Sequence, residues 1–414
     1  MGFGQGVSGI NAAAQNLDVI GNNISNSGTV GFKQSTATFA DVYAGSRVGL
    51  GVRVNSVVQS FNQGNIEASG RALDVAITGG NGFFRLVDDA GQVYFSRNGQ
   101  LKRLDDGRLV NASGLQVTGY PAGVQPGGGV QPQPLVIANT QMPPKATDSI
   151  TAQFNLDSRV TAPTTPFATA AGDPPDSAMF NYSSTIEIFD SLGNPRQVTA
   201  YFRKMGPEHQ DPLDPTTPVV GTNWNMYVTD ENGGLLTTEA MRFDLNGNMV
   251  LPAAGATVGV PVAGANGAAD MTVQMNLAGT TQFGSENDPK TLVQNGYASG
   301  ALLGYTVQPD GSILGSFSNE QTMNLGQIVL ATFGNVEGLQ PEGDNVWTAT
   351  GASGQPLLGA PGGSYGQLQS NAVEASNVDL SGQLVNLIIA QRTYQANAQT
   401  IQAQDQVLQT LVNI

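Results

Sequence analysis

The chain of 414 residues contains no cysteine, and this absence excludes several chemistries at once. Without thiols there is no disulfide, no zinc site with sulfur ligands and no cysteine nucleophile. Charge is also scarce, because only 12% of the residues are Asp, Glu, Lys or Arg, and their net charge is −15. An acidic surface repels phosphate groups, and no run of basic residues is longer than a pair such as Arg203 and Lys204. We therefore expect neither nucleic acids nor anionic membranes as partners.

Long apolar runs are missing as well. No window offers the roughly 18 to 20 apolar residues that a membrane-spanning helix requires. The first basic residue is Lys33, and the preceding MGFGQGVSGINAAAQNL is interrupted by Gly, Asn and Gln. A cleavable signal peptide needs a basic start and an apolar core, so we expect neither membrane insertion nor the ordinary secretory route.

Glycine and proline are abundant, with 53 and 22 residues. This composition indicates many turns and short strands, with helices confined to a few places. Because single cores usually stop growing at about 250 to 300 residues, the length predicts two to four domains.

The two ends of the chain share a seven-residue spacing of apolar side chains, which predicts a helix at each end. At the N-terminus the spaced residues are Phe3, Ile10, Leu17 and Ile24. At the C-terminus they are Leu380, Leu387, Tyr394, Ile401 and Leu408, with Leu384 at a companion position. If it is continuous over Ala372 to Asn413, the second helix is roughly 60 Å long, against roughly 35 Å for the first. We call these ten residues the predicted seam.

Such a stripe is ordinarily typical of a helix packed on its own core. Here the opposite faces carry almost no charge: residues 1–32 hold only Asp18, and residues 371–414 hold four charges among 13 Asn and Gln. A helix facing water usually alternates Lys and Glu. Amide-rich faces instead favour contact with other copies of the chain or with a polar lumen.

The region between the ends reads as β structure. Turn signals separate short alternating segments from Leu73 to Tyr120, and Asn98-Gly99 favours a type I′ hairpin. The Pro-rich stretch 121–147 reads as a linker, and the Gly-rich stretch 351–366 reads as a connector. Residues 146–284 contain 14 acidic and 5 basic residues, which is −9 of the total charge, in a further set of short strands.

No catalytic, cofactor or metal site is indicated. The single histidine, His209, lies in a Pro-rich loop without a nucleophile-type serine, so we expect a surface residue. Carboxylate pairs at 88–89 and 105–106 lie at turns, where Asp is favoured for its own backbone hydrogen bonds. The GxGxxG pattern at residues 4–9 precedes any strand, which argues against a dinucleotide loop and for glycines at a helix start.

The stretch NNISNSGTVGFK, residues 22–33, begins where the first apolar seam ends. Asn and Gly tolerate the left-handed conformation that ends a helix, and Asn side chains can satisfy its free carbonyls. We interpret the stretch as a joint between the helix and the rest of the chain. The residues that we assign to this joint are Asn22, Asn23, Asn26, Thr29, Gly31, Phe32 and Lys33.

Four motifs, in order along the chain, resemble the bacterial flagellar axial proteins of the rod and hook family. They are LDVIGNNISNSGTVGFK (17–33), RNGQLKRLDDGRLVNASGLQVTGY (97–120), FGNVEGLQPEGDNVWTATGASGQP (333–356) and EASNVDLSGQLVNLIIAQRTYQANAQTIQAQDQVLQTLVN (374–413). Distal rod members of the family are shorter, and the inserted acidic region makes the hook members the closer match. The resemblance implies a mainly β, multidomain chain with paired terminal α-helices and nested domains.

The resemblance implies four domains. They are 1–30 with 368–414 as a coiled-coil-like tube domain, 31–70 with 357–367 as a connecting segment, 71–145 with 285–356 as a β-rich domain, and 146–284 as an outer acidic β domain.

The resemblance also implies a function: a structural subunit, not an enzyme, that polymerises into a curved hollow tube, the universal joint of the flagellum. Implied partners are further copies of the chain, the distal rod, hook cap, hook-filament junction and hook-length control proteins, and the type III export apparatus through which the chain would leave the cell. A distal rod protein is the alternative within the family. A secreted carbohydrate-binding β protein is the alternative from another class, although Trp224 and Trp347 lie in different predicted domains.

Overall fold

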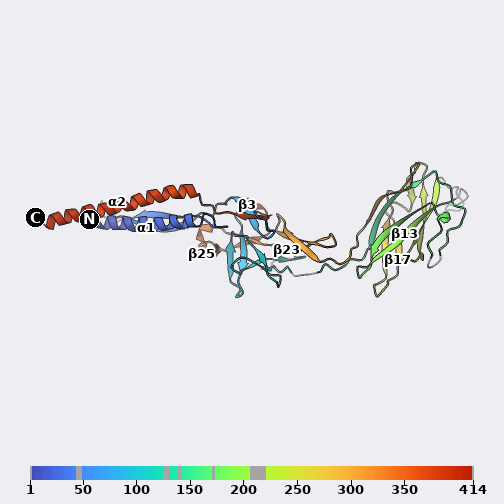
Figure 1. The fold of residues 1–414 in the computed structure, drawn as a ribbon, viewed down its shortest axis with the longest axis horizontal. Coiled ribbons are helices and arrows are strands. Elements are labelled where there is room, and N and C mark those ends of the chain that lie inside the picture. Colours follow the sequence, from blue (N-terminus) through green and yellow to red (C-terminus); the bar gives the residue numbers. More distant parts are fainter. Residues whose placement is uncertain are drawn as a thin grey trace. The chain divides into compact units, whose positions relative to one another are not determined.

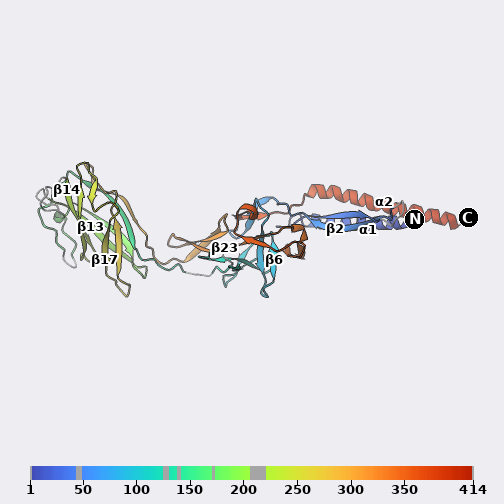
Figure 2. The same cartoon turned by 180° about the vertical axis from the view of Figure 1, so that it is seen from behind.

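The computed structural model describes residues 2–42, 49–124, 130–137, 141–169, 173–205 and 221–412. His209, predicted to be a surface residue, lies outside these ranges. The chain forms two compact units (Figures 1 and 2). Unit 1 comprises residues 1–140, 302–316 and 322–414, and unit 2 comprises residues 141–301 and 317–321.

Unit 1 contains both helices, α1 (Gly2–Ser25) and α2 (Leu380–Val412), which lie side by side although they come from opposite ends of the chain (Figure 1). With strands filling the rest of the molecule, the predicted fold class is confirmed: mainly β, with paired terminal helices. No helix within the described ranges is both long and apolar enough to cross a bilayer.

The second helix begins at Leu380, the first residue of its seven-residue spacing, and not at Ala372. Residues Ala372–Glu374 form β29, which pairs antiparallel with β3 (Ile66–Ala68). Asp379 then caps the helix, because its carboxylate accepts a hydrogen bond from the Ser381 amide at 3.1 Å. The expected continuous helix from Ala372 is therefore wrong. The 33 residues of α2 span about 50 Å and the 24 of α1 about 36 Å.

A hairpin of β1 (Ser35–Asp41) and β2 (Val52–Gln59) follows α1 directly and lies along it (Figure 2). Its residues fall in the range 31–70 that the sequence indicated only as a connecting segment. The hairpin therefore extends the helix pair with a two-stranded sheet.

The β part of unit 1 is built around a 13-stranded sheet with the order β21-β22-β23-β9-β5-β6-β26-β25 along its main path. The strands of unit 1 not yet given are β4 (Val75–Thr78), β5 (Phe83–Val87), β6 (Val93–Ser96), β7 (Lys102–Arg103), β8 (Leu109–Val110), β9 (Gln116–Pro121), β10 (Gln133–Pro134), β21 (Leu302–Val307), β22 (Ser312–Phe317), β23 (Thr322–Ile328), β24 (Leu330–Thr332), β25 (Gln340–Gly343), β26 (Val346–Thr348), β27 (Leu357–Gly359) and β28 (Gln367–Ser370). Short 3-10 helices at Val336–Gly338 and Gly363–Tyr365 complete it.

Three local predictions for this sheet differ from the structure. Within the stretch read as a linker, Leu135 and Ile137 are buried in the core of unit 1. Within the Gly-rich connector, β27 pairs with β24. Neither Asn98 nor Gly99 has a positive φ, so the type I′ turn does not form. In each case tertiary burial outweighs the local turn chemistry, since Gly99 accepts a hydrogen bond from the Val75 amide at 2.9 Å instead.

Unit 2 is a β-sandwich of two five-stranded sheets, ordered β12-β13-β14-β15-β16 and β17-β18-β11-β19 with β20 also paired to β11. Side chains from both sheets form one buried core, including Phe154, Phe202 and Trp224. The strands are β11 (Ser149–Asp157), β12 (Tyr182–Phe189), β13 (Pro195–Lys204), β14 (Thr222–Thr229), β15 (Leu235–Phe243), β16 (Met249–Leu251), β17 (Thr257–Val262), β18 (Met271–Asn276), β19 (Thr281–Phe283) and β20 (Asp288–Gln294), with a 3-10 turn at Ser177–Met179.

The end of unit 2 lies beyond the predicted boundary at residue 284. Strand β20 pairs antiparallel with β11, so it belongs to the sandwich. Unit 2 in fact extends to residue 301 and takes in residues 317–321. The finer, four-part division of the chain stays a prediction.

Candidate assembly site

The interface between α1 and α2 is made by small and amide side chains. On α1 the buried residues include Ala13, Ile20 and Asn23, and Gly6 and Gly9 lie on the same face. Positions 6, 13 and 20 repeat every seven residues, and so do positions 9, 16 and 23. A heptad spacing therefore does organise the pair, but in a different row from the predicted seam.

Two glycines of α1 lie directly against side chains of α2. A Cβ atom on Gly6 would lie 2.8 Å from Cγ1 of Ile401, and one on Gly9 would lie 2.6 Å from Oδ1 of Asn397. These two residues belong to the GxGxxG pattern, which we expected only to mark a helix start. Their structural role is to leave room for Ile401 and Asn397, because a larger side chain at either position would force these two side chains to move.

The predicted seam lies largely outside this interface. Its exposed members, with fractional exposures of 39–53%, are Phe3, Leu380, Leu384, Tyr394 and Leu408. Its half-buried members are Ile10, Leu17, Ile24, Leu387 and Ile401. On α2 the buried side chains among those described are Gln383 and Ala390. Ile401 is the seam member that packs against Gly6 of α1, while the exposed members lie away from that contact.

The turn that follows α1 is held by the Asn residues of the joint. The Asn26 side-chain amide donates to the Asn22 carbonyl at 3.0 Å, and the Thr29 hydroxyl donates to Oδ1 of Asn26 at 3.1 Å. The Asn22 carbonyl also accepts from the Asn26 backbone amide at 3.1 Å, so the side chain adds a second hydrogen bond to it. These contacts tie the next four residues back to the helix.

Asn23 holds the start of the β1–β2 hairpin against α1. Its side chain is buried, donates to the Ser35 carbonyl at 2.7 Å and accepts from the Ser35 amide at 2.9 Å. A side-chain amide that pairs with both backbone groups of one residue imitates a neighbouring strand. The chain is thereby reversed immediately after the helix.

Gly31 has a φ of +73°, and a Cβ atom there would lie 2.8 Å from the Asn98 backbone nitrogen. Both the backbone conformation and the close approach therefore require glycine. The next residue, Phe32, is buried, and the Gly31 amide donates to the Glu374 carbonyl at 2.8 Å. The joint is thus fastened to the strand that leads into α2.

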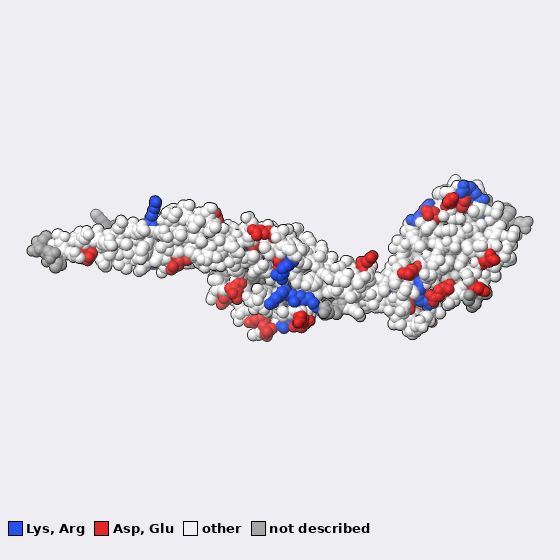
Figure 3. Space-filling view, viewed as in Figure 1, with Lys and Arg blue, Asp and Glu red and all other residues white. Residues whose placement is uncertain are grey.

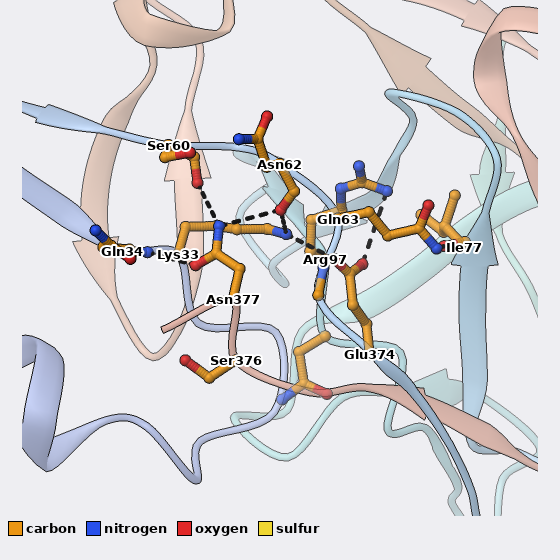
Figure 4. A network of polar contacts seen from close by, with 12 residues as sticks. Lys33, Gln34, Ser60, Asn62, Gln63, Ile77, Arg97, Glu374, Ser376 and Asn377 are labelled. Atoms are coloured by element: carbon orange, nitrogen blue, oxygen red, sulfur yellow. Dashed lines mark hydrogen bonds and ion pairs between the residues drawn. The ribbon is translucent and has the colours of Figure 1, made fainter. Parts of the chain in front are cut away.

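A buried ion triad of Lys33, Arg97 and Glu374 lies at the centre of this junction, and Figure 4 shows the three side chains pointing toward one another. The Lys33 ammonium donates to Oε1 of Glu374 at 2.6 Å, with both side chains fully buried. The Arg97 guanidinium lies 3.8 Å from Oε2 of Glu374 and 5.3 Å from the centre of the Phe83 ring. One carboxylate thus connects the joint, the β part of unit 1 and the segment before α2.

Neighbouring groups extend the network. Lys33 also donates to the Asn62 carbonyl at 2.8 Å, and the Gly64 amide donates to Glu374 at 2.9 Å. Asn377 accepts from the Gln34 amide at 2.7 Å (Figure 4). The segment before α2 is therefore held from two sides of the joint.

Burial lowers the pKa of the Lys33 ammonium and of the Arg97 guanidinium, because both lose water that would stabilise the charge. The attraction of Glu374 partly offsets this loss in each case. Breaking a buried ion pair by removing one partner typically costs about 3 to 5 kcal/mol. The triad is accordingly a rigid point, where the removal of the Glu374 carboxylate leaves two buried positive charges without a partner.

Of the joint residues, the sequence identified Lys33 but not its partners Arg97 and Glu374. Both lie in motifs that carry the family resemblance, but no pattern in the sequence links them. A usable signal was the rarity of charge, because Lys33 is the first basic residue of the chain and Glu374 is one of four charges after residue 370. A charge kept in such a segment usually has a buried partner.

The carboxylates considered for chemistry serve turns. Asp88 accepts from the Gln92 amide at 2.8 Å, and Asp106 accepts from the Arg108 amide at 3.1 Å. Within the described ranges, no three His, Asp or Glu side chains gather in a way that could hold a metal ion. What this region of the molecule offers instead is an exposed apolar surface on a rigid support.

Comparison with family models matches most of the chain. Residues 5–33 match the flagella basal body rod protein family, 76–155 the flagellar hook protein FlgE/F/G D1 domain, 155–297 the flagellar basal body protein FlaE D2 domain, and 369–414 the flagellar basal body rod FlgEFG protein C-terminal family.

Among curated proteins, the chain is 47% identical to flagellar hook protein FlgE of Escherichia coli K12, with both chains covered in full. It is 46% identical to FlgE of Salmonella typhimurium, again in full, and 29% identical to FlgE of Borreliella burgdorferi over 99% of this chain and 98% of that one. Among solved structures, flagellar hook protein FlgE2 of Helicobacter pylori aligns with a TM-score of 0.54 at 14% identity, covering 75% of this chain and all of the other. At that identity the likeness concerns the fold alone.

Proposed function

The chain belongs to the flagellar hook protein FlgE family, and from this premise we propose that its copies assemble through the apolar side chains that α1 and α2 leave exposed. It is a structural subunit of the bacterial flagellar hook. The match over the full length of hook proteins favours the hook over a distal rod protein. The proposal concerns how one subunit holds the next.

The proposal rests on the exposure of large apolar side chains on the surface of the helix pair. Leu384, Ile388 and Leu408 are each about half exposed, whereas the interface between the helices buries Gly and Ala. Burying one large aliphatic side chain stabilises an assembly by about 1.5 to 3 kcal/mol. Several such residues per subunit supply enough free energy to order the helices in a polymer.

The joint and its ion triad give this assembly a firm connection to the β part of unit 1. Lys33, Arg97 and Glu374 are buried, so a displacement of the helix pair relative to the sheet would separate charges in a region without water. In the proposed hook, a curved hollow tube, torque passes from helix pair to β domain through this point. Acidic surfaces of the inserted domain would make shallower contacts that can slide as the tube bends.

The proposed partners are those of an axial flagellar protein. They are further copies of the chain, the distal rod, hook cap, hook-filament junction and hook-length control proteins, and the type III export apparatus. Since the curated relatives are structural hook proteins, we propose no catalytic role.

A carbohydrate-binding role finds no support in the aromatic side chains. Trp224 is fully buried in unit 2, and Trp347 is 2% exposed in unit 1. A sugar-binding platform needs an accessible aromatic face, and neither indole offers one.

Electron microscopy of the concentrated protein in precipitating salt tests the proposal. We expect tubes from the unmodified chain and none from Leu384→Asp, because a buried carboxylate without a partner costs several kcal/mol. The matched control is Leu245→Asp, at a leucine of unit 2 that is 81% exposed, which should still form tubes. Discrete particles from the unmodified chain would contradict the proposal, and so would normal tubes from Leu384→Asp.

A further inference from the structure

The C-terminal end of α2 extends past the end of α1 (Figure 1). The helices run antiparallel, with Gly9 opposite Asn397 and Gly6 opposite Ile401. Continuing this pairing places Gly2 opposite about residue 405. Residues 406–412, about 10 Å of helix, therefore have no partner in α1. We call them the α2 overhang.

The overhang carries no charge and exposes two large apolar side chains. Its sequence is QVLQTLV, in which Val407 is 60% exposed and Leu408 is 53% exposed. The charged residue just before it, Asp405, accepts a hydrogen bond from Gln409 at 2.9 Å. Short unsupported helix ends fray in water, so this segment gains order only when a partner covers it.

An uncharged groove of about 620 Å³ lies elsewhere on the same helix pair, between α1, α2 and β1. Ala12, Ala13 and Ile20 of α1 line it, with Phe39 of β1 and Ile389 of α2 beside them. Phe39 is 45% exposed and Ile389 is 57% exposed. All of the lining residues are uncharged, so an apolar helix end could enter without desolvating a charge. Figure 3 likewise shows few charged side chains over the helix pair.

We propose that the α2 overhang of one copy seats in this groove of a second copy. The inference rests on the proposed function, because it names the contact by which one subunit holds the next. Donor and acceptor are different surfaces of the same chain, so the contact is heterologous and repeats without closing, as a tube requires. The groove borders α2 around Ala390, which is 19 residues before Gln409. Successive copies are therefore displaced by about 28 Å along the helix direction.

We choose the overhang over the other exposed apolar residues of α2 because it is the part of the helix that extends past α1. Leu384, Val385 and Ile388 are also exposed, but they lie on the part of α2 that flanks the groove in its own chain. The overhang alone projects beyond its own pair. These three residues remain available for lateral contacts and serve as the competing occupant in the test.

The natural absence of cysteine permits a clean cross-linking test. Full-length copies with Asn16→Cys, in the groove, are polymerised with tagged copies carrying Leu408→Cys, in the overhang, and then oxidised. Each copy has one thiol, so a disulfide must join two copies, and it forms only where their Cα atoms approach within about 7 Å. The matched controls are Gln15→Cys on the exposed side of α1 and Leu384→Cys as the competing occupant.

We expect heterodimers from positions 16 and 408, at about ten times the yield of either control pair, because only these two lie in contact. Equal or greater yields from 16 with 384, or from 15 with 408, would overturn the inference. Electron microscopy of the same mixtures distinguishes a failure of the docking contact from a failure of the proposed function. Tubes without the 16–408 cross-link refute the docking alone, and a failure of the unmodified chain to form tubes refutes the proposed function.

If a cysteine itself prevents assembly, a second pair of variants tests whether the overhang docks in the groove. Leu408→Met keeps an apolar side chain and should polymerise near the unmodified critical concentration. Leu408→Asp should raise that concentration by about tenfold or more, since a charge would enter an uncharged groove. Normal polymerisation of Leu408→Asp would overturn the inference whatever the cross-linking shows.

Discussion

The helix pair and unit 2 bury their side chains in opposite ways. In unit 2 the large residues lie inside, with Phe154, Phe202 and Trp224 fully buried between two sheets. In the helix pair many large apolar residues are exposed, such as Leu384, Ile388 and Leu408, and glycine, alanine and amide side chains make much of the contact. Unit 2 therefore completes its core within one chain, whereas the helix pair leaves apolar surface to be covered by other copies.

Charge follows the same division. Acidic and basic side chains are frequent over the β parts of the molecule and sparse over α1 and α2 (Figure 3). A surface that remains in water tolerates charge, while a surface that becomes buried on assembly loses free energy for each unpaired charge. The distribution thus separates the part of the chain built to stay hydrated from the part built to be covered.

The largest expected contrast is in the stability of the monomer. Phe154→Ala should destabilise unit 2 by about 3 to 5 kcal/mol, because it opens a cavity beside Phe202, whose ring centre lies 4.8 Å away. Leu384→Ala should change the stability of the monomer by less than about 0.5 kcal/mol, since that side chain is half exposed. Urea unfolding measures both. Similar losses in the two variants would show that the helix pair also buries its core within one chain.

Glu374→Gln should cost about 3 kcal/mol or more, because it leaves the buried charges of Lys33 and Arg97 without their carboxylate. The substitution removes a rigid point of unit 1, and the stability of unit 2 does not depend on that point. Calorimetry should show a lowered transition for unit 1 and an unchanged one for unit 2. The matched control is Glu67→Gln on the adjacent strand β3, where the carboxylate is exposed. A loss of equal size in the control would contradict a special role for the triad.

Gly31→Val should have a smaller effect on stability, about 1 to 3 kcal/mol, from a strained positive φ and a close approach to Asn98. We expect the variant to be exported but to polymerise poorly, because the joint holds the helices at a fixed place on the β part. Motility and microscopy of hooks measure the outcome. Gly28→Val is the control, with no atom within 4 Å of its added Cβ. Normal motile hooks from Gly31→Val would refute the joint.

Much of the fold was predictable because period and composition report it directly. The seven-residue spacing predicted a helix at each end, and the abundance of turn residues predicted strands between them. The spacing did not tell which row faces the partner helix. Large residues usually mark the buried row, but Gly6 and Gly9 lie in the row that faces α2, with Ile401 packed against Gly6.

The candidate site was predictable only where the chain contacts itself locally. The Asn residues of the joint indicated a helix end, and their hydrogen bonds are local. Glu374, in contrast, lies 341 residues from Lys33 and meets it only through tertiary folding. A helix start at Ala372 does not hold for the same reason, because the pairing of β29 with β3 is a long-range contact, whereas the seven-residue spacing itself begins at Leu380, where α2 starts.

Amide hydrogen exchange of α2, compared between dilute monomer and polymer, tests most directly whether the helix pair depends on other copies. Among the described side chains of α2, Gln383 and Ala390 are the buried ones, and a helix with so little packing is marginal in water. We therefore predict rapid exchange at residues 384–408 in the monomer and strong protection in the polymer, while the strands of unit 2 stay protected in both. Strong protection of residues 384–408 in the dilute monomer would contradict the account.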